Sequence, residues 1–104
     1  MQVVIIDTKG RALQHVAKVS KSANDDVMWV AQGNGGPWKV TFDKAGHTPA
    51  GSPFSAGVYL VPQGGFVRTT GGPVNGTVDF TYKYNVRDGN SNAITNDPDI
   101  DIEG

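Results

Sequence analysis

The chain has 104 residues, a formal net charge of −1 and no cysteine. A chain of this length is expected to fold as one domain that buries roughly 60–70% of the surface exposed when it is unfolded. The missing cysteines exclude disulfides, thiolate metal centres and cysteine nucleophiles, and the balanced charge gives no electrostatic footprint for nucleic acid or an anionic membrane.

The first part of the chain predicts short strands separated by turns. Val3–Ile6 is a β-branched run that is typical of a strand. Residues 11–19 fit either a helical face or an irregular strand, and we expect extended structure because the segments that follow have β character. Val27–Ala31 predicts the next strand, in which Val27 and Trp29 face inward.

A glycine-rich turn leads into the strand predicted for residues 38–42, around which we expect the fold to be organised. Side chains in a strand alternate between its two faces. The inward set is Trp38, Val40 and Phe42, and the solvated set is Lys39, Thr41 and Asp43. We expect this strand to pair with residues 26–31 across the turn, as in a hairpin.

The second part of the chain continues the same pattern. Residues 43–55 contain two prolines and two glycines, which predicts a long loop. Short strands are expected at residues 57–61 and 66–69, and a closing strand with inward isoleucines at residues 100–103. Residues 78–86 give the clearest strand pattern. Its expected inward side chains are Val78, Phe80, Tyr82, Tyr84 and Val86.

These segments add up to about seven or eight short strands with turns roughly every 8–12 residues, which is the signature of a β-sandwich or barrel. No segment requires a helix, and we predict a single all-β domain over residues 1–104. We expect Trp29, Trp38 and Phe80 to lie in the core between the sheets, where burial of each side chain stabilises the fold.

Several stretches of the chain follow the order of a known family. A strand at residues 26–30 and an Asn-Gly turn at 34–35 precede Pro-Trp-Lys-Val-Thr-Phe-Asp at 37–43. A Gly-x-x-x-Phe-x-Tyr strand follows at 76–84, and Asp-Pro-Asp-Ile-Asp-Ile at 97–102. This order resembles the cupredoxins, and in particular small bacterial proteins of this kind that end in Asp-Pro-x-Ile-x-Ile. The resemblance implies a Greek-key β-sandwich, with an immunoglobulin-like sandwich as the alternative.

The resemblance lacks the family's copper ligands. A blue-copper site needs two histidines, a cysteine thiolate and usually an axial methionine. Trp38 stands where the first ligand histidine is expected, the chain has no cysteine, and residues 87–98 contain neither histidine nor methionine. The resemblance therefore implies a copper-free member, in which the Trp38 indole fills the ligand pocket by packing.

Other candidate sites have simpler interpretations beside the functional one. His15 and His47 are the only histidines, and nothing in their spacing brings them together. Residues 88–92 begin like a calcium loop, with Asp99 at position twelve, but Ala93 replaces the glycine of position six. Calcium binding and Asx-turn hydrogen bonds remain open for the four side chains concerned. These are Asp88, Asn90, Asn92 and Asp99.

Two further motifs and two aromatic residues are also ambiguous. Residues 33–36 are rich in glycine but lead into a strand, which favours a hairpin over a phosphate cradle. Asn75 begins a glycosylation sequon that also fits an Asn-Gly turn. Phe54 and Tyr59 are the aromatic residues that a ligand-binding loop would present, although Phe54 also fits a plug at the end of the sandwich.

We therefore expect a non-enzymatic, copper-free, cupredoxin-like interaction or structural module, with no catalytic residue, metal or cofactor assigned. The alternative is a domain that binds a small ligand, most plausibly carbohydrate, through loop aromatics. The partner is another protein or a small ligand, and the functional surface is expected in loops 43–55, 70–76 and 88–97. Because no secretory signal precedes the first strand, a cytoplasmic product is expected.

Overall fold

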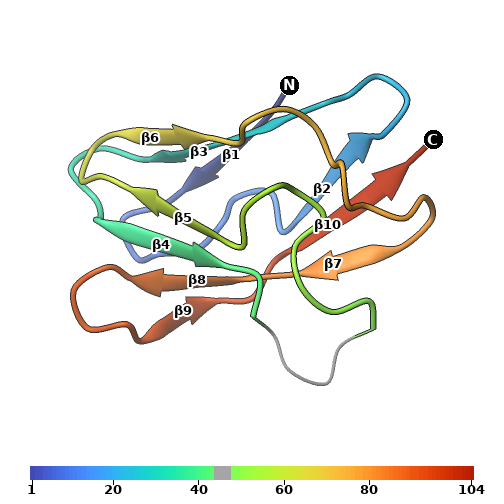
Figure 1. Ribbon diagram of the computed structural model, residues 1–104. Helices are drawn as coiled ribbons and strands as arrows, with labels where there is room; N and C mark the ends of the chain where they lie inside the picture. Colours follow the sequence, from blue (N-terminus) through green and yellow to red (C-terminus); the bar gives the residue numbers. More distant parts are fainter. Residues whose placement is uncertain (44–47) are drawn as a thin grey trace.

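The computed structural model describes residues 1–43 and 48–104, and this part of the chain is all-β with ten strands and no helix (Figure 1). The strands are β1 (Gln2–Ile6), β2 (Val16–Ser20), β3 (Val27–Ala31), β4 (Trp38–Thr41), β5 (Val58–Val61), β6 (Phe66–Arg68), β7 (Thr81–Lys83), β8 (Asn85–Asp88), β9 (Ile94–Asn96) and β10 (Asp99–Glu103). The all-β prediction is confirmed. The described residues hold more strands than the expected seven or eight, because residues 78–86 are divided and the short β9 was not foreseen.

The strands form three small sheets in the orders β1-β3-β6, β2-β10-β7 and β5-β4-β8-β9. The second and third sheets are joined because β7 leads directly into β8, and β9 leads into β10. Between these pairs the Tyr84 amide donates to the Pro98 carbonyl at 3.0 Å, so residues 81–103 form one bent hairpin. Figure 1 shows β1, β3 and β6 on the upper side of a sandwich-like arrangement and β4, β7, β8 and β9 below.

The predicted hairpin between residues 26–31 and 38–42 is wrong. β3 pairs in parallel with β1 and antiparallel with β6, whereas β4 pairs with β5 and β8. The glycine-rich turn instead carries the chain from one layer to the other, with Gly36 in the left-handed region at a φ of 92°. This crossing lets Trp29 and Trp38 enter the core from different sheets.

An aromatic cluster centred on Trp29 fills the core. The ring centroid of Trp29 lies 5.2 Å from that of Tyr59 and 5.7 Å from that of Tyr84. The Trp29 indole N–H donates to the Tyr84 hydroxyl at 3.2 Å. Phe42 and Phe54 meet the same indole edge-on. The inward orientations predicted for Val27, Trp29, Trp38, Val40, Phe42, Ile100 and Ile102 are confirmed.

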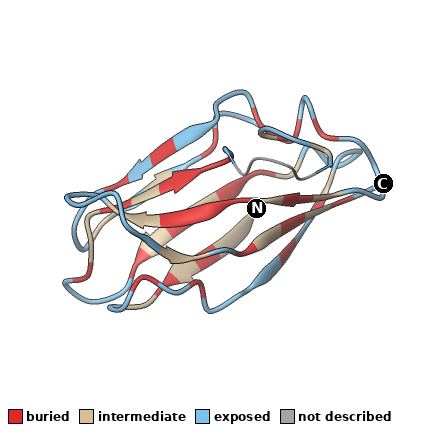
Figure 2. Ribbon diagram, turned by 90° about the horizontal axis from the view of Figure 1, so that it is seen from below, coloured by how far each residue is buried: buried red, intermediate tan, exposed pale blue. Residues whose placement is uncertain are grey.

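Two aromatic residues that loops might have presented are buried instead. Phe54 is only 1% exposed, which confirms its interpretation as a plug. Tyr59 is also buried, and β5 turns Val58 and Leu60 to solvent. The Ala56 amide donates to the Tyr59 hydroxyl at 3.3 Å, so the polar end of the buried ring is satisfied. Figure 2 shows buried and exposed positions alternating along the strands, with the loops largely exposed.

The prediction of one inward-facing strand over residues 78–86 is partly wrong. Asp79 has a φ of 68°, and the Phe80 amide closes a turn on the Thr77 carbonyl, so regular pairing starts only at Thr81. This turn places Phe80 at the surface with 45% exposure, whereas Tyr82 beyond it is buried. The prediction that Phe80 belongs to the core is therefore wrong.

Candidate functional site

Two buried polar side chains lie on the outward face of the third sheet. Thr41 on β4 and Asn85 on β8 are register partners and are only 3% and 5% exposed. The expectation that Thr41 is solvated is therefore wrong. Burying a polar group is unfavourable unless it forms hydrogen bonds, so this pair needs charged or polar neighbours above it.

Those neighbours are Asp43 and Arg87. The Arg87 Nε donates to the Thr41 hydroxyl at 3.2 Å, its Nη1 donates to the Asn92 carbonyl at 3.1 Å, and its Nη2 lies 3.5 Å from the Asp43 carboxylate. The Asn85 amide donates to the other Asp43 oxygen at 3.4 Å. We call Thr41, Asp43, Asn85 and Arg87 the polar network.

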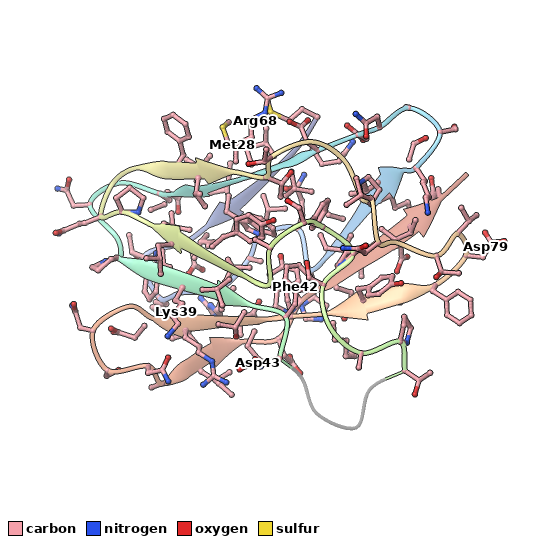
Figure 3. All side chains as sticks on the ribbon, viewed as in Figure 1. Met28, Lys39, Phe42, Asp43, Arg68 and Asp79 are labelled. Carbon is pink, nitrogen blue, oxygen red and sulfur yellow. The ribbon has the colours of Figure 1, made fainter. Side chains whose placement is uncertain are left out.

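The polar network favours the ionised form of Asp43. A hydrogen bond from Thr41 lowers the pKa of the Asp43 carboxyl below its ordinary value, and the Asn85 amide and the Arg87 charge act in the same direction. Burial opposes this shift without reversing it. Figure 3 shows Lys39 and Asp43 on the outer side of β4, whereas Phe42 lies toward the interior.

An open depression of about 570 Å³ lies beside the polar network. Its walls are Asp43, Asn85, Arg87, Ile94, Thr95, Asn96 and Asp97. The chain near residue 11 fixes two of these side chains. The Thr95 hydroxyl donates to the Gly10 carbonyl at 2.7 Å, and the Asn96 side-chain oxygen accepts from the Ala12 amide at 3.1 Å. We call this hollow the polar depression.

The outer face of the first sheet has the opposite character. Ile5, Val30 and Phe66 form one row across its three strands, and Val3, Met28 and Arg68 form the next. We call the five hydrophobic side chains of these rows the apolar face. Phe66 is 62% exposed, and the other four are half-buried. Figure 3 shows Met28 and Arg68 on this outer side.

A small group of ion pairs borders the apolar face. The Arg68 Nε donates to the Asp26 carboxylate, and the amino group of Met1 lies 2.6 Å from Asp25 and 4.0 Å from Asp26. The hydrogen bond from Arg68 lowers the pKa of the Asp26 carboxyl. These charged groups therefore lie together along one edge of the apolar face.

Three of the four candidate calcium ligands, Asp88, Asn92 and Asp99, have protein partners in the structure. The Asp88 carboxylate accepts the amide N–H groups of Asn90 at 2.8 Å and Ser91 at 3.2 Å, which is an Asx turn in the β8–β9 connection. The Asn92 side-chain oxygen accepts from Lys39, and Asp99 pairs with Lys83 at 2.6 Å. These contacts favour the turn interpretation over a calcium loop.

The histidines do not form a site in the described residues. His15 is exposed, and its carbonyl accepts the Asp99 amide, whereas His47 lies outside the described residues. Within residues 1–43 and 48–104, no three His, Asp or Glu side chains are grouped in a way that would hold a metal. The prediction for His47 is therefore untested.

The Trp38 indole is enclosed by packing. A Cβ atom at Gly10 would lie 2.8 Å from its ring, and one at Gly36 would lie 3.2 Å from it, so both glycines are needed for this close approach. Its Nε1 is buried and has no hydrogen-bond acceptor among the described residues.

The remaining motifs form turns. The Gly35 amide donates to Gln32, and the segment leads into β4. The Gly76 amide donates to Pro73, and the Asn75 side chain donates to the Phe54 carbonyl at 3.2 Å. These contacts favour a turn over a phosphate-binding loop at residues 33–36, and a turn over a glycosylation site at Asn75.

No family model, curated protein or solved structure matches this chain. In the described residues, no helix is long and apolar enough to cross a membrane. The polar network was missed from the sequence, although a signal exists: Thr41 and Asp43, and likewise Asn85 and Arg87, are polar residues spaced two apart. Only the pairing of β4 with β8 brings these two pairs together.

Proposed function

We propose that the chain is a non-enzymatic, copper-free interaction module with a Greek-key, cupredoxin-like sandwich, and that its apolar face binds another protein. Parallel pairing of β1 with β3, and of β2 with β10, supports the Greek-key topology, because parallel neighbours require connections that leave the sheet. The close packing around Trp38 supports a pocket filled by side chains.

The apolar face is the observation that carries the proposal. A sheet face in water normally shows polar residues at alternate positions, whereas strands covered on both sides are apolar throughout. β1 carries Val3 and Ile5 outward, and Val4 and Ile6 inward. Among the described residues, nothing covers the outward pair fully, so a second protein is the natural cover.

The polar depression supports binding rather than catalysis. Among the described residues, its walls contain one hydroxyl group, that of Thr95, which already donates to a backbone carbonyl. A nucleophile would need a neighbouring base to remove its proton. The alternative function through loop aromatics loses support, because Phe54 and Tyr59 are buried in the core.

A capture experiment with matched surface variants tests the proposal. Wild-type protein, Phe66→Asp and Val74→Asp are immobilised and exposed to native lysate of the source organism, and retained proteins are identified by mass spectrometry. Val74 is a suitable control because it is similarly exposed, at 58% against 62% for Phe66, but lies in a loop outside the three strands of the apolar face.

We expect one or more proteins to be retained by wild type and by Val74→Asp, and lost with Phe66→Asp. Direct titration of a purified retained protein should then show the same order of affinities. Equal retention by all three forms, or equal loss in both variants, would contradict binding at the apolar face. Sedimentation of the purified chain shows in parallel whether a second copy is the partner.

A further inference from the structure

We propose that the polar depression binds a neutral, polyhydroxylated ligand of the size of one or two sugar rings, held by Asp43, Arg87, Asn96 and Ile94. This inference is independent of the protein contact proposed for the apolar face, because the two surfaces belong to different sheets. Its ligand would not contact Phe54 or Tyr59, which are buried.

The size and rigidity of the depression favour a small ligand. A volume of about 570 Å³ lies within the roughly 300–1,000 Å³ typical of small-molecule sites. The Arg87 side chain is only 18% exposed and is held by three different acceptors. Binding to groups that are already fixed costs little conformational entropy.

The charges around the depression favour a ligand without net charge. An anion approaching Arg87 would also meet the carboxylate of Asp43, and a cation approaching Asp43 would meet Arg87. A neutral hydroxyl compound can hydrogen-bond to the open sides of the Asp43–Arg87 pair without separating it. Hydrogen bonds to charged groups are stronger than those between neutral groups.

The remaining walls fit the two-sided character of a sugar ring. Ile94 is 56% exposed and supplies an aliphatic surface next to the polar groups. The Asn96 oxygen is occupied by the Ala12 amide, and no contact within the described residues uses its NH₂ group as a donor. Ring C–H groups can therefore rest on Ile94 while ring hydroxyls bond to Asn96 and Asp43.

The test is a two-dimensional amide NMR titration of the whole purified chain. The probes are methyl α-glucopyranoside, methyl β-galactopyranoside, methyl α-mannopyranoside and cellobiose, with glycine, a zwitterion, and acetate, an anion, as ionic comparison compounds. We expect at least one sugar to give saturable shifts at the signals of Asn85, Arg87, Ile94 and Asn96. Neither glycine nor acetate should saturate these signals.

Matched variants complete the test. Ile94→Asp should weaken the sugar affinity about tenfold or more, because it replaces the aliphatic wall by a charge beside Arg87, the register partner of Ile94. Leu60→Asp adds the same charge on the outer face of the same sheet, beside Lys39 rather than beside the polar network, and should leave the affinity unchanged. Both positions are exposed, and the variants' amide spectra report whether the fold is retained.

The proposal is overturned if no sugar gives saturable shifts, if the shifts map away from the depression, or if Ile94→Asp binds as well as wild type. Saturation by glycine or acetate instead would assign the depression to charged ligands. None of these outcomes bears on the protein capture proposed for the apolar face, since Phe66 and Ile94 lie on different sheets.

Discussion

The outer faces of the first and third sheets each carry an Asp–Arg pair, and the two pairs are built in opposite ways. In the first sheet the Asp26 side chain is 13% exposed and that of Arg68 is 57% exposed. In the third sheet the Arg87 side chain is 18% exposed and that of Asp43 is 58% exposed. The buried member of the pair is therefore the aspartate in the first sheet and the arginine in the third sheet.

This difference matches the surroundings of each pair. Arg68 stands at the edge of the apolar face, where its exposed guanidinium remains available to a partner. Arg87 lies above the buried Thr41 and Asn85 and helps to satisfy their polar groups. One charged pair borders the apolar face, and the other lines the polar depression.

Both faces depend on one aromatic core, and its removal should have the largest effect. Trp29→Ala deletes a fully buried indole that meets four aromatic rings, so it should lower the free energy of unfolding by about 3–5 kcal/mol. Urea denaturation measured by circular dichroism gives this value. A midpoint close to that of wild type would mean that the first sheet does not pack through Trp29.

The buried arginine should be more important for stability than the exposed one. Arg87→Met removes the donor that satisfies the Thr41 hydroxyl and the Asn92 carbonyl, and should cost about 1–3 kcal/mol. Arg68→Met is the matched control and should cost about 1 kcal/mol or less, because its guanidinium is largely hydrated. If the denaturant midpoints rank the two variants in the reverse order, the claim that the buried Arg87 stabilises the fold more than the exposed Arg68 is wrong.

Alternation predicted the interior well where only one face of a strand is apolar or where the turns are regular. It placed Trp38, Val40 and Phe42 inward, and the structure confirms this. In β5 every residue is hydrophobic, so period two gave no means of choosing a face, and Tyr59 was kept as a candidate for ligand binding although it is buried. At Phe80 the left-handed backbone of Asp79 shifted the phase of the pattern.

Long-range pairing explains what remained hidden. Nothing local indicates that residues 32–37 cross between layers, because the same glycines also suit a hairpin. The polar network joins residues about forty positions apart, such as Asp43 and Asn85, through the register of β4 with β8. The apolar face was equally hidden, since the run at residues 3–6 indicates a strand but not which side another protein would cover.

The smallest expected effect concerns the acids of the two pairs and depends on pH. Arg68 lowers the pKa of folded Asp26, so the ionised carboxylate stabilises the fold. This contribution is fully present above the unfolded-state pKa of about 3.9 and is lost as the pH falls through the lower folded-state value. Asp26→Asn should therefore cost about 1 kcal/mol at pH 7 and progressively less below pH about 4.

Asp43→Asn is the matched control, because Thr41, Asn85 and Arg87 lower the pKa of Asp43 in the same sense. The Asp43 side chain is far more exposed than that of Asp26, so water screens more of its interactions with the neighbouring groups. The decrease in the free energy of unfolding at pH 7 should therefore be smaller for Asp43→Asn. Urea denaturation of the three proteins from pH 7 to pH 3 measures both losses. A larger loss for Asp43→Asn would mean that the third sheet, rather than the first, depends on its acid.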